Sequence, residues 1–219
     1  MLEHVYLTIK NRILNNYYPP GIRIVEADLT TEFKVSRGTV RVAMHRLIGD
    51  KLLEKTPHRG IVVHKVTLEE LIEIYTLLSY LESLAAKLIA ENGDPKLIEE
   101  LNYLVKEDAK AVADDDFMLH LKLMDRFHDI IVEESGNQTL VDILKPLSLA
   151  SRNMRFLMPL KVRMVRSFNT HTKLVEAINA RDGDLAEAIM KEHDIEAINI
   201  IKNAIQENDK SKIETSINL

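Results

Sequence analysis

Three histidines in the second half of the sequence have the residue type and the spacing of a metal site. His128, His171 and His193 each fall on the apolar stripe of a different predicted helix, so all three side chains are expected to point inward. Imidazole binds zinc, nickel, iron and copper, and three protein ligands leave positions open for water or for a carboxylate of a small molecule. The pattern predicts a divalent transition metal, such as zinc or nickel, with an open coordination position.

The separation of His171 and His193 makes this prediction more specific. They are 22 residues apart, and position 182, midway between them, falls in the turn sequence RDGD. In an antiparallel pair of helices, residues at equal distance from the turn lie at equal height, here ~16 Å from it at about 1.5 Å of rise per residue. A single buried histidine is more often a hydrogen-bonded core residue, so a core role is the alternative interpretation.

A second group of residues has the chemistry of DNA recognition. The stretch KVSRGTVRVAMHRL, residues 34–47, carries apolar side chains at helical spacing, with basic and hydroxyl side chains near its N-terminal end. An arginine can donate two hydrogen bonds to O6 and N7 of a guanine, worth roughly 1–3 kcal/mol of discrimination. The stretch therefore predicts a recognition helix for the major groove of double-stranded operator DNA. Its candidate contacts are Ser36, which also caps the helix, Arg37, Thr39 and Arg41.

The elements around this helix support the same interpretation. Predicted helices over residues 5–16 and 25–33 precede it, the second after the breaker sequence YYPPG and just before a tight turn. Two short β-like runs, KLLEKT and GIVVHKV, follow it and predict a hairpin. The hairpin tip forms a wing that can enter a minor groove through His58, Arg59 and Gly60. A solvated basic face would suffice to explain an isolated helix, but the turn and the wing favour DNA binding.

The sequence VSRGTVRVAMHRLIGDKLLEKTPHRGIVV resembles the winged helix-turn-helix of GntR-type transcription regulators. The resemblance implies base and phosphate reading by Arg37 and Arg41, and DNA backbone contacts by Ser36 and Thr39. It also implies that the hairpin tip lies near the minor groove. Threonine at position 39 replaces the usual proline and Lys51 replaces a usual glycine, but neither change removes a predicted reader.

Downstream of residue 66 the sequence predicts a bundle of helices. Their expected ranges are 67–92, 95–113, 116–135, 138–158, 160–181 and 184–206, with short connections typical of antiparallel packing. The expected fold class is therefore mainly α, with an N-terminal winged helix-turn-helix at residues 1–66 and a C-terminal antiparallel all-α helical bundle at residues 67–219. The first part carries 11 Lys and Arg against 6 Asp and Glu, and the second 18 against 28. A basic head on an acidic body suits a polyanionic partner for the head.

The helical part resembles the FCD effector domain of FadR-type GntR regulators, in its short six-helix, VanR-like form. That family's metal pattern is D-x-x-x-H, a later histidine and another about 22 residues on, which matches His128, His171 and His193. Met124 stands where the family has aspartate. Asp125, one residue away, lies on roughly the same side of the helix and is a candidate fourth ligand. A site with three histidines alone, or one that no longer binds metal, are the alternatives.

Two arginines and one further histidine complete the candidate residues. Arg152 and Arg155 are basic residues in an acidic domain, and either can bind an effector carboxylate that the metal does not hold. Ordinary surface ion pairs are the simpler role for both. His120 lies ~12 Å from His128 along the same helix, too far to share a metal, and is expected to be a core or pocket-wall residue.

Composition excludes several other classes. The chain has no cysteine, so it has neither disulfides nor thiolate metal sites. No run approaches the ~20 apolar residues of a membrane span, so the expected location is cytoplasmic, with no membrane partner. A metalloenzyme is a remote alternative, because no carboxylate is clearly placed as a general base beside the histidines and a basic winged head would have no role. The protein is not expected to be an enzyme.

Together these features predict a transcription regulator that is controlled by a small molecule. Its head would read a pseudo-palindromic operator, and its helical domain would bind an effector, a carboxylate held through the metal. We expect the regulator to repress transcription and the effector to relieve that repression. A homodimer follows from the resemblance, with residues 67–92 as the expected interface. Two alternatives stay open, namely a DNA-binding metal sensor and a regulator whose metal is purely structural.

Overall fold

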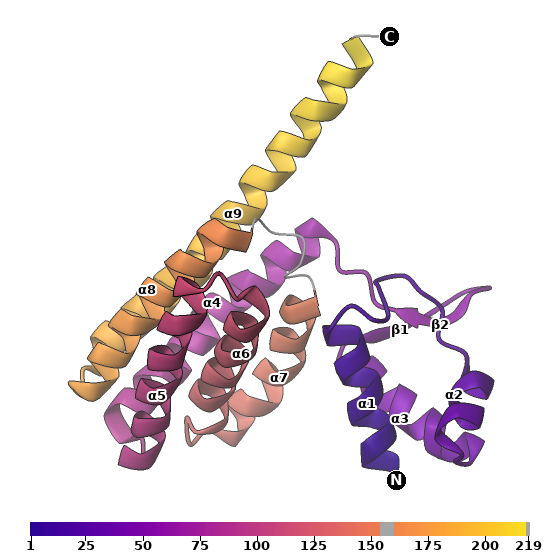
Figure 1. Cartoon of the computed structure of the whole chain (residues 1–219), viewed down its shortest axis with the longest axis horizontal. Helices are drawn as coiled ribbons and strands as arrows, with labels where there is room; N and C mark the ends of the chain where they lie inside the picture. Colours follow the sequence, from indigo (N-terminus) through magenta and orange to yellow (C-terminus); the bar gives the residue numbers. More distant parts are fainter. Residues whose placement is uncertain (154–159, 218–219) are drawn as a thin grey trace. The chain divides into compact units, whose positions relative to one another are not determined.

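The computed structural model describes the backbone of residues 1–153 and 160–217, and the side chains of residues 1–152 and 164–203. It divides into two compact units, whose elements are drawn in Figure 1. The first unit comprises Met1–Thr67 together with Lys145–Arg155, and the second comprises Leu68–Leu144 together with Phe156–Leu219. The sequence predicted a single boundary after residue 66, and the grouping of residues 145–155 with the first unit has no counterpart in that prediction.

The first unit has the order helix, helix, helix, hairpin that the sequence predicted. Its elements are α1 Leu2–Leu14, α2 Glu26–Phe33, α3 Arg37–Gly49, β1 Leu53–Thr56 and β2 Gly60–Val63. The two strands are antiparallel, with Leu53 opposite Val63 and Thr56 opposite Gly60. An isolated bridge between Arg23 and Val62 adds the segment before α2 to the far edge of β2.

Helix α3 starts and packs as its sequence predicts. The Ser36 hydroxyl oxygen accepts a hydrogen bond from the Thr39 backbone N–H at 3.1 Å, which confirms the predicted N-cap. Val40, Met44 and Leu47 are fully buried and join the core of the first unit. Because those positions share one side of the helix, the opposite side is left exposed.

The core of the first unit also explains why a segment from the helical half belongs to it. Apolar side chains of α1, α3 and the hairpin form one buried cluster, and Leu149 of α7 is a member that is only 3% exposed. The hydrophobic contribution of such a buried leucine is about 1.5–3 kcal/mol. A sequence pattern shows that Leu149 is apolar but does not show which core receives it.

The second unit is built from long helices. They are α4 Leu68–Asn92, α5 Pro95–Ala113, α6 Phe117–Glu133, the first part of α7 Gln138–Asn153, α8 Leu160–Asn179 and α9 Gly183–Ile217. Helix α4 packs on α6, α8 and α9, and α5 packs on α6 and α8. The structure thus confirms the mainly α fold with a small two-stranded sheet. In the described residues, no helix is both long and apolar enough to cross a lipid bilayer.

Local signals set most helix boundaries in this unit. Asp94 caps α5 by accepting from the Lys96 N–H at 2.8 Å, and Pro95 occupies the first helical position, where its missing N–H has no cost. Asp116 caps α6 by accepting from the Leu119 N–H at 3.0 Å. Helix α9 runs to Ile217 rather than ending at the predicted residue 206, because no glycine or proline follows residue 183.

Candidate metal centre and DNA-binding surface

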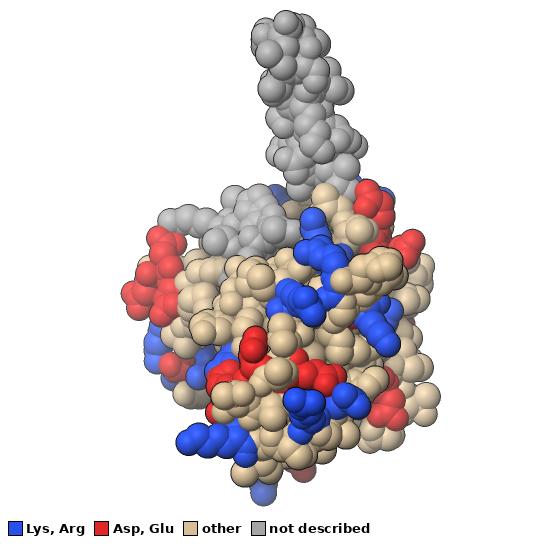
Figure 2. Space-filling view, turned by 90° about the vertical axis from the view of Figure 1, so that its right-hand side faces the viewer, with Lys and Arg blue, Asp and Glu red and all other residues tan. Residues whose placement is uncertain are grey.

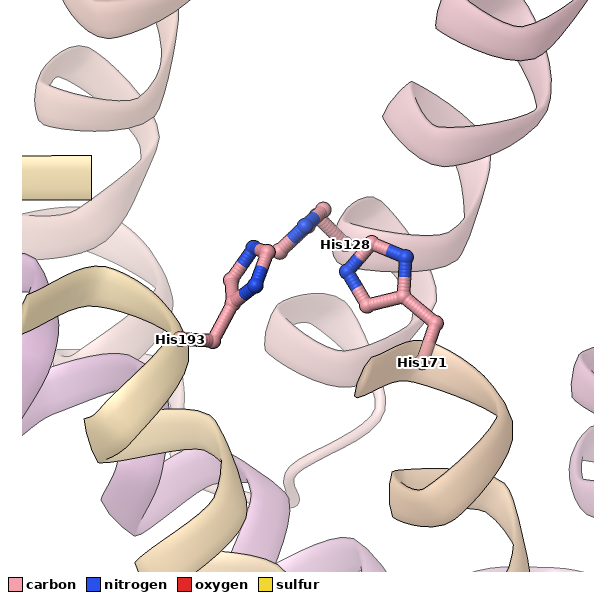
Figure 3. Close-up of side chains that lie close together, drawn as sticks. All are labelled: His128, His171 and His193. Atoms are coloured by element: carbon pink, nitrogen blue, oxygen red, sulfur yellow. The ribbon is translucent and has the colours of Figure 1, made fainter. Parts of the chain in front are cut away.

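The three predicted histidines lie together, one on each of three helices. His128 is on α6, His171 on α8 and His193 on α9, and their rings face one another in Figure 3. One ring nitrogen from each lies within 4.8 Å of one from each of the others. The ring centroids of His171 and His193 are 4.8 Å apart, and those of His128 and His171 are 5.0 Å apart. The predicted proximity is confirmed, while a role in metal binding stays a prediction.

The turn between α8 and α9 brings two of these rings to the same height. Asp182 donates its backbone N–H to the Ala177 carbonyl at 3.0 Å, and its carboxylate accepts from the Leu185 N–H at 3.0 Å. Arg181 adopts a positive φ of 58° there, so the chain reverses within a few residues. Equal spacing from this tight turn then places His171 opposite His193.

The Nδ1 atoms of two rings contact neighbours on the outer side of the cluster. His128 Nδ1 lies 3.0 Å from Glu82 Oε2 of α4. His171 Nδ1 lies 2.7 Å from Met124 Sδ and 3.4 Å from the Ser167 hydroxyl. A ring whose Nδ1–H is held in this way presents Nε2 as its coordinating atom.

Two buried carboxyl groups near the cluster were not predicted. Glu82 is 4% exposed and Asp194 is 2% exposed. Burial raises the pKa of Asp194 well above its ordinary range, and the negative charge of Glu82 raises it further. Burial therefore favours the neutral form of Asp194, and among the described residues its Oδ2 has no hydrogen-bond partner. A signal for Glu82 did exist in the sequence, because it falls on the apolar stripe of α4 between Leu78 and Ala86.

The donor set fits a transition metal. At the usual metal–nitrogen distance of about 2.0–2.1 Å, tetrahedral coordination separates ligand nitrogens by about 3.3 Å. The separations in the cluster are bounded by 4.8 Å, and His171 is only 1% exposed. Asp125 is not a member of this group of ligand atoms, so its role as a fourth ligand gains no support from the geometry. Met124, at the position of the usual aspartate, contacts His171 and supplies no oxygen.

The remaining predicted residues of the helical half lie apart from the cluster. His120 is buried, and its Nδ1 is 2.7 Å from Oδ1 of Asp108, in keeping with the expected core role. Arg152 is partly buried in the segment that groups with the first unit. Arg155 lies outside the described residues. Effector binding by either arginine stays a prediction.

The predicted DNA-contacting residues of α3 are at the surface. Ser36, Arg37 and Arg41 are exposed, whereas Thr39 is half-buried and its hydroxyl lies 2.9 Å from that of Ser36. Arg41 makes an ion pair with Glu26 of α2, at 3.2 Å between Nη2 and Oε2, and hydrogen bonding to this carboxylate raises the pKa of Arg41. On the face displayed in Figure 2, basic side chains stand beside acidic ones.

The six arginines of residues 1–66 divide into two groups. Three make ion pairs: Arg12 with Glu32, Arg41 with Glu26 and Arg46 with Glu3. The other three, Arg23, Arg37 and Arg59, make no ion pair with any described residue. A cation without an internal partner can contact a phosphate without first losing an ion pair, so this second group is best suited to DNA binding.

The wing has the backbone that its sequence requires. His58 and Gly60 both have positive φ, 65° and 78°, a conformation that glycine adopts without strain. His58 and Arg59 are exposed at this tip. Arg23, which the sequence gave no reason to single out, lies beside it, since a Cβ added to Gly60 would be 3.8 Å from Arg23 Nε. Gly60, its neighbour in the fold, follows 37 residues later in the sequence, so only the structure shows that Arg23 lies at the wing.

Comparisons with known proteins agree with this arrangement. Residues 2–63 match the family described as "Bacterial regulatory proteins, gntR family", and residues 73–197 match the FCD domain. An HTH-type transcriptional regulator of Bacillus subtilis (strain 168), YdhC, is 32% identical over 142 residues, which cover 64% of this chain and 63% of that protein. The HTH-type transcriptional repressor RspR of Escherichia coli (strain K12) is 24% identical over 211 residues, which cover 94% of this chain and 91% of that protein.

Solved structures show the same fold. The structure of McbR/YncC from E. coli superposes with a TM-score of 0.78 at 21% identity, covering 92% of this chain and 97% of that chain. A GntR regulator from Rhodococcus sp. RHA1 superposes with a TM-score of 0.77 at 19% identity, covering 93% and 98%. With a matched DNA-binding family, a matched FCD domain and relatives that are regulators rather than enzymes, the chain belongs to the GntR family of bacterial regulatory proteins, as a transcriptional regulator with an FCD domain.

Proposed function

We propose that this regulator is a homodimeric repressor whose affinity for its operator is set by a small carboxylate, bound through a divalent transition metal at His128, His171 and His193. The observation that carries the proposal is the convergence of three imidazoles from α6, α8 and α9, with ligand nitrogens within 4.8 Å of one another. A repressor named RspR among the relatives supports the sign of regulation.

In the head, the proposal assigns sequence reading to the exposed side of α3. Arg37 has no ion-pair partner among the described residues and is the leading base reader, while Ser36 and Thr39 anchor the DNA backbone. Arg41 contacts DNA by exchanging Glu26 for a phosphate or a base. His58, Arg59 and Gly60 form the wing at the minor groove. The regulator then acts in the cytoplasm, where its DNA is.

In the helical half, the three histidines would hold the metal through ring nitrogens. When bound, a zinc or nickel ion with open positions supplies a Lewis acid that attracts a carboxylate. His128 and His193 are half-buried, whereas His171 is buried, so a small molecule would approach the metal past His128 and His193. In a dimer, effector binding would alter the spacing of the two DNA-binding heads. A coupling free energy of about 1–3 kcal/mol between effector binding and DNA binding would then change operator affinity several- to about a hundred-fold.

Two alternative functions would use the same three histidines. In a metal sensor the ion itself changes DNA affinity, and in a structural site the ion only stabilises the fold. The effector-regulated form is favoured because three imidazoles leave coordination positions open, whereas structural zinc sites are closed by four protein ligands.

The test is the metal content of untagged protein, purified without chelator, for the wild type and for His171→Ala. About one transition metal per chain is expected in the wild type and none in the variant, and equal contents would contradict the proposal. His120→Ala is the matched control, because His120 is buried beside Asp108 and is not a member of the cluster. Adding acetate, a monocarboxylate that does not chelate the metal away, to the metal-loaded protein and measuring DNA affinity then separates effector control from metal sensing.

A further inference from the structure

Helix α4 carries a carboxylate where its packing calls for an apolar residue. Glu82 is 4% exposed and shares the buried stripe with Leu78 and Ala86, which are 2% and 0% exposed. Burying a carboxyl group costs several kcal/mol unless it is paired or hydrogen-bonded. The packing of α4 does not require this group, so its partner indicates its role.

The His128 ring is one such partner. Glu82 Oε2 lies 3.0 Å from His128 Nδ1, across the contact between α4 and α6. We propose that Glu82 is a positioning residue of the histidine cluster, which accepts the Nδ1–H of His128 and so directs the Nε2 lone pair toward the metal. This inference rests on the proposed metal function.

Glu82 differs in chemistry from the groups behind His171. Met124 Sδ and the Ser167 hydroxyl lie near the Nδ1 of that ring, and both are weaker acceptors than a carboxylate oxygen. Three imidazoles bring no negative charge to a divalent ion, and Met124 adds none. Glu82 therefore gives His128 a carboxylate acceptor, and it would also place a negative charge near a cation held by the three histidines.

The experiment uses two readouts on the full chain. In apo protein labelled with ¹⁵N-histidine, His128 is expected as the Nδ1–H tautomer, and Glu82→Gln should shift it toward the Nε2–H form. In the same proteins, zinc affinity measured by chelator competition should fall about 10- to 100-fold in Glu82→Gln, the usual effect of losing such a partner. Glu82→Asp should recover part of the affinity and provides a second variant if Glu82→Gln folds poorly.

Ser83→Ala is the matched control, because Ser83 is also buried on α4 but its hydroxyl bonds to the Tyr80 carbonyl of its own helix. Equal zinc affinity in the wild type and Glu82→Gln, with an unchanged tautomer, overturns the inference and leaves the metal function standing. A wild type that binds no zinc overturns the proposed function, and the tautomer then shows separately whether Glu82 orients His128.

A separate observation concerns the edge of the wing. The segment before α2 runs antiparallel to β2, since the Gly21 N–H donates to the Val63 carbonyl and the Ile24 N–H donates to the Ile61 carbonyl, both at 2.9 Å. Ile24 is buried, so Arg23 points to the opposite, exposed face. Its guanidinium lies beside Gly60, because a Cβ added there would be 3.8 Å from Arg23 Nε and 4.0 Å from Nη2.

We infer that Arg23 is a further DNA contact, which binds a backbone phosphate next to the wing. Three features support this role: its exposure, its position beside Gly60 at the wing, and its lack of an ion-pair partner among the described residues. A guanidinium binds phosphate oxygens with two parallel hydrogen bonds and carries no sequence information in doing so.

Because a phosphate contact does not depend on sequence, a 30-base-pair duplex of arbitrary sequence is a sufficient probe. Arg23→Ala should weaken binding and lower the slope of log K against log salt by about 0.9, the value for one phosphate contact. Arg23→Lys should retain most of the slope. Lys96→Ala, which removes an exposed cation from the second unit, is the control for net charge. A slope and affinity in Arg23→Ala equal to those of this control would overturn the inference.

Discussion

The two units of this regulator place their charged residues differently. Among the described residues, the first unit buries no aspartate, glutamate, lysine, arginine or histidine, and its arginine pairs are at least partly exposed. The second unit buries five such residues: Glu82, Asp108, His120, His171 and Asp194. Exposed ion pairs contribute about 0–1 kcal/mol, whereas leaving a buried charge without its partner costs about 3–5 kcal/mol.

This contrast suits the two kinds of ligand that we propose, DNA for the first unit and a metal with a small carboxylate for the second. A head that binds DNA benefits from weak surface pairs, since each can be exchanged for a phosphate at little cost. A site for a metal and a small molecule benefits from rigid, desolvated groups whose positions are fixed before the ligand arrives. Substitutions in the second unit should therefore act through stability and metal binding, and substitutions on the surface of the first should act through DNA affinity alone.

The largest effect is expected for Phe127→Ala. Phe127 is fully buried, and its ring centroid lies 4.6 Å from that of His171. Removing the ring should lower the free energy of unfolding by about 3–5 kcal/mol and also weaken metal binding, because the cavity frees His171. Urea denaturation and chelator competition measure the two effects.

Leu47→Ala in the first unit provides the matched comparison. Leu47 is equally buried, and the expected loss of stability is about 2–5 kcal/mol, but the histidine cluster should bind metal as before. If Leu47→Ala reduced metal affinity as much as Phe127→Ala, the difference between the two units would not hold.

A smaller effect, confined to DNA, is expected for Arg37→Ala. Loss of a bidentate contact to a base should weaken operator binding by about 1–3 kcal/mol and relax sequence preference at one position. Stability and metal content should not change, because Arg37 is exposed and makes no ion pair with a described residue. Fluorescence anisotropy on operator and on scrambled DNA provides the measurement, and an equal loss on both would assign Arg37 to phosphate rather than base contact.

Much of the fold and part of the candidate metal site follow from local sequence. Ser36, Asp94 and Asp116 each precede a helix that they cap, and the equal spacing of His171 and His193 from residue 182 predicts their proximity. Partners between distant segments do not follow in this way. Glu82 meets His128 46 residues later, and Glu26 meets Arg41 through the packing of two helices. Such contacts depend on crossing angles and side-chain rotamers, which a periodic pattern does not specify.

The buried carboxyl group of Asp194 should make the stability of the second unit depend on pH. Its pKa is raised by burial, so in apo protein the folded state keeps a proton that the unfolded state releases above about pH 4. The unfolded state then binds fewer protons, and the free energy of unfolding falls as the pH rises from there toward the folded pKa, by at most about 1.4 kcal/mol per pH unit. Urea midpoints between pH 4 and 7 should show this decline in the wild type and a weaker one in Asp194→Asn, and parallel profiles would rule out the assignment.

The smallest effect is expected for Glu26→Gln, which tests the role of the exposed ion pairs in the first unit. The change removes the carboxylate that pairs with Arg41 and also removes a negative charge from α2, near the recognition helix. DNA affinity should therefore rise, by about two- to fivefold, since an exposed pair costs little to break. Stability should stay nearly constant because both side chains are at the surface. Glu32→Gln, which breaks the Arg12 pair of the same unit, is the comparison variant. If DNA affinity fell in Glu26→Gln, the carboxylate would be orienting Arg41 for its contact rather than competing with DNA for it, and the pair would belong to the reading surface.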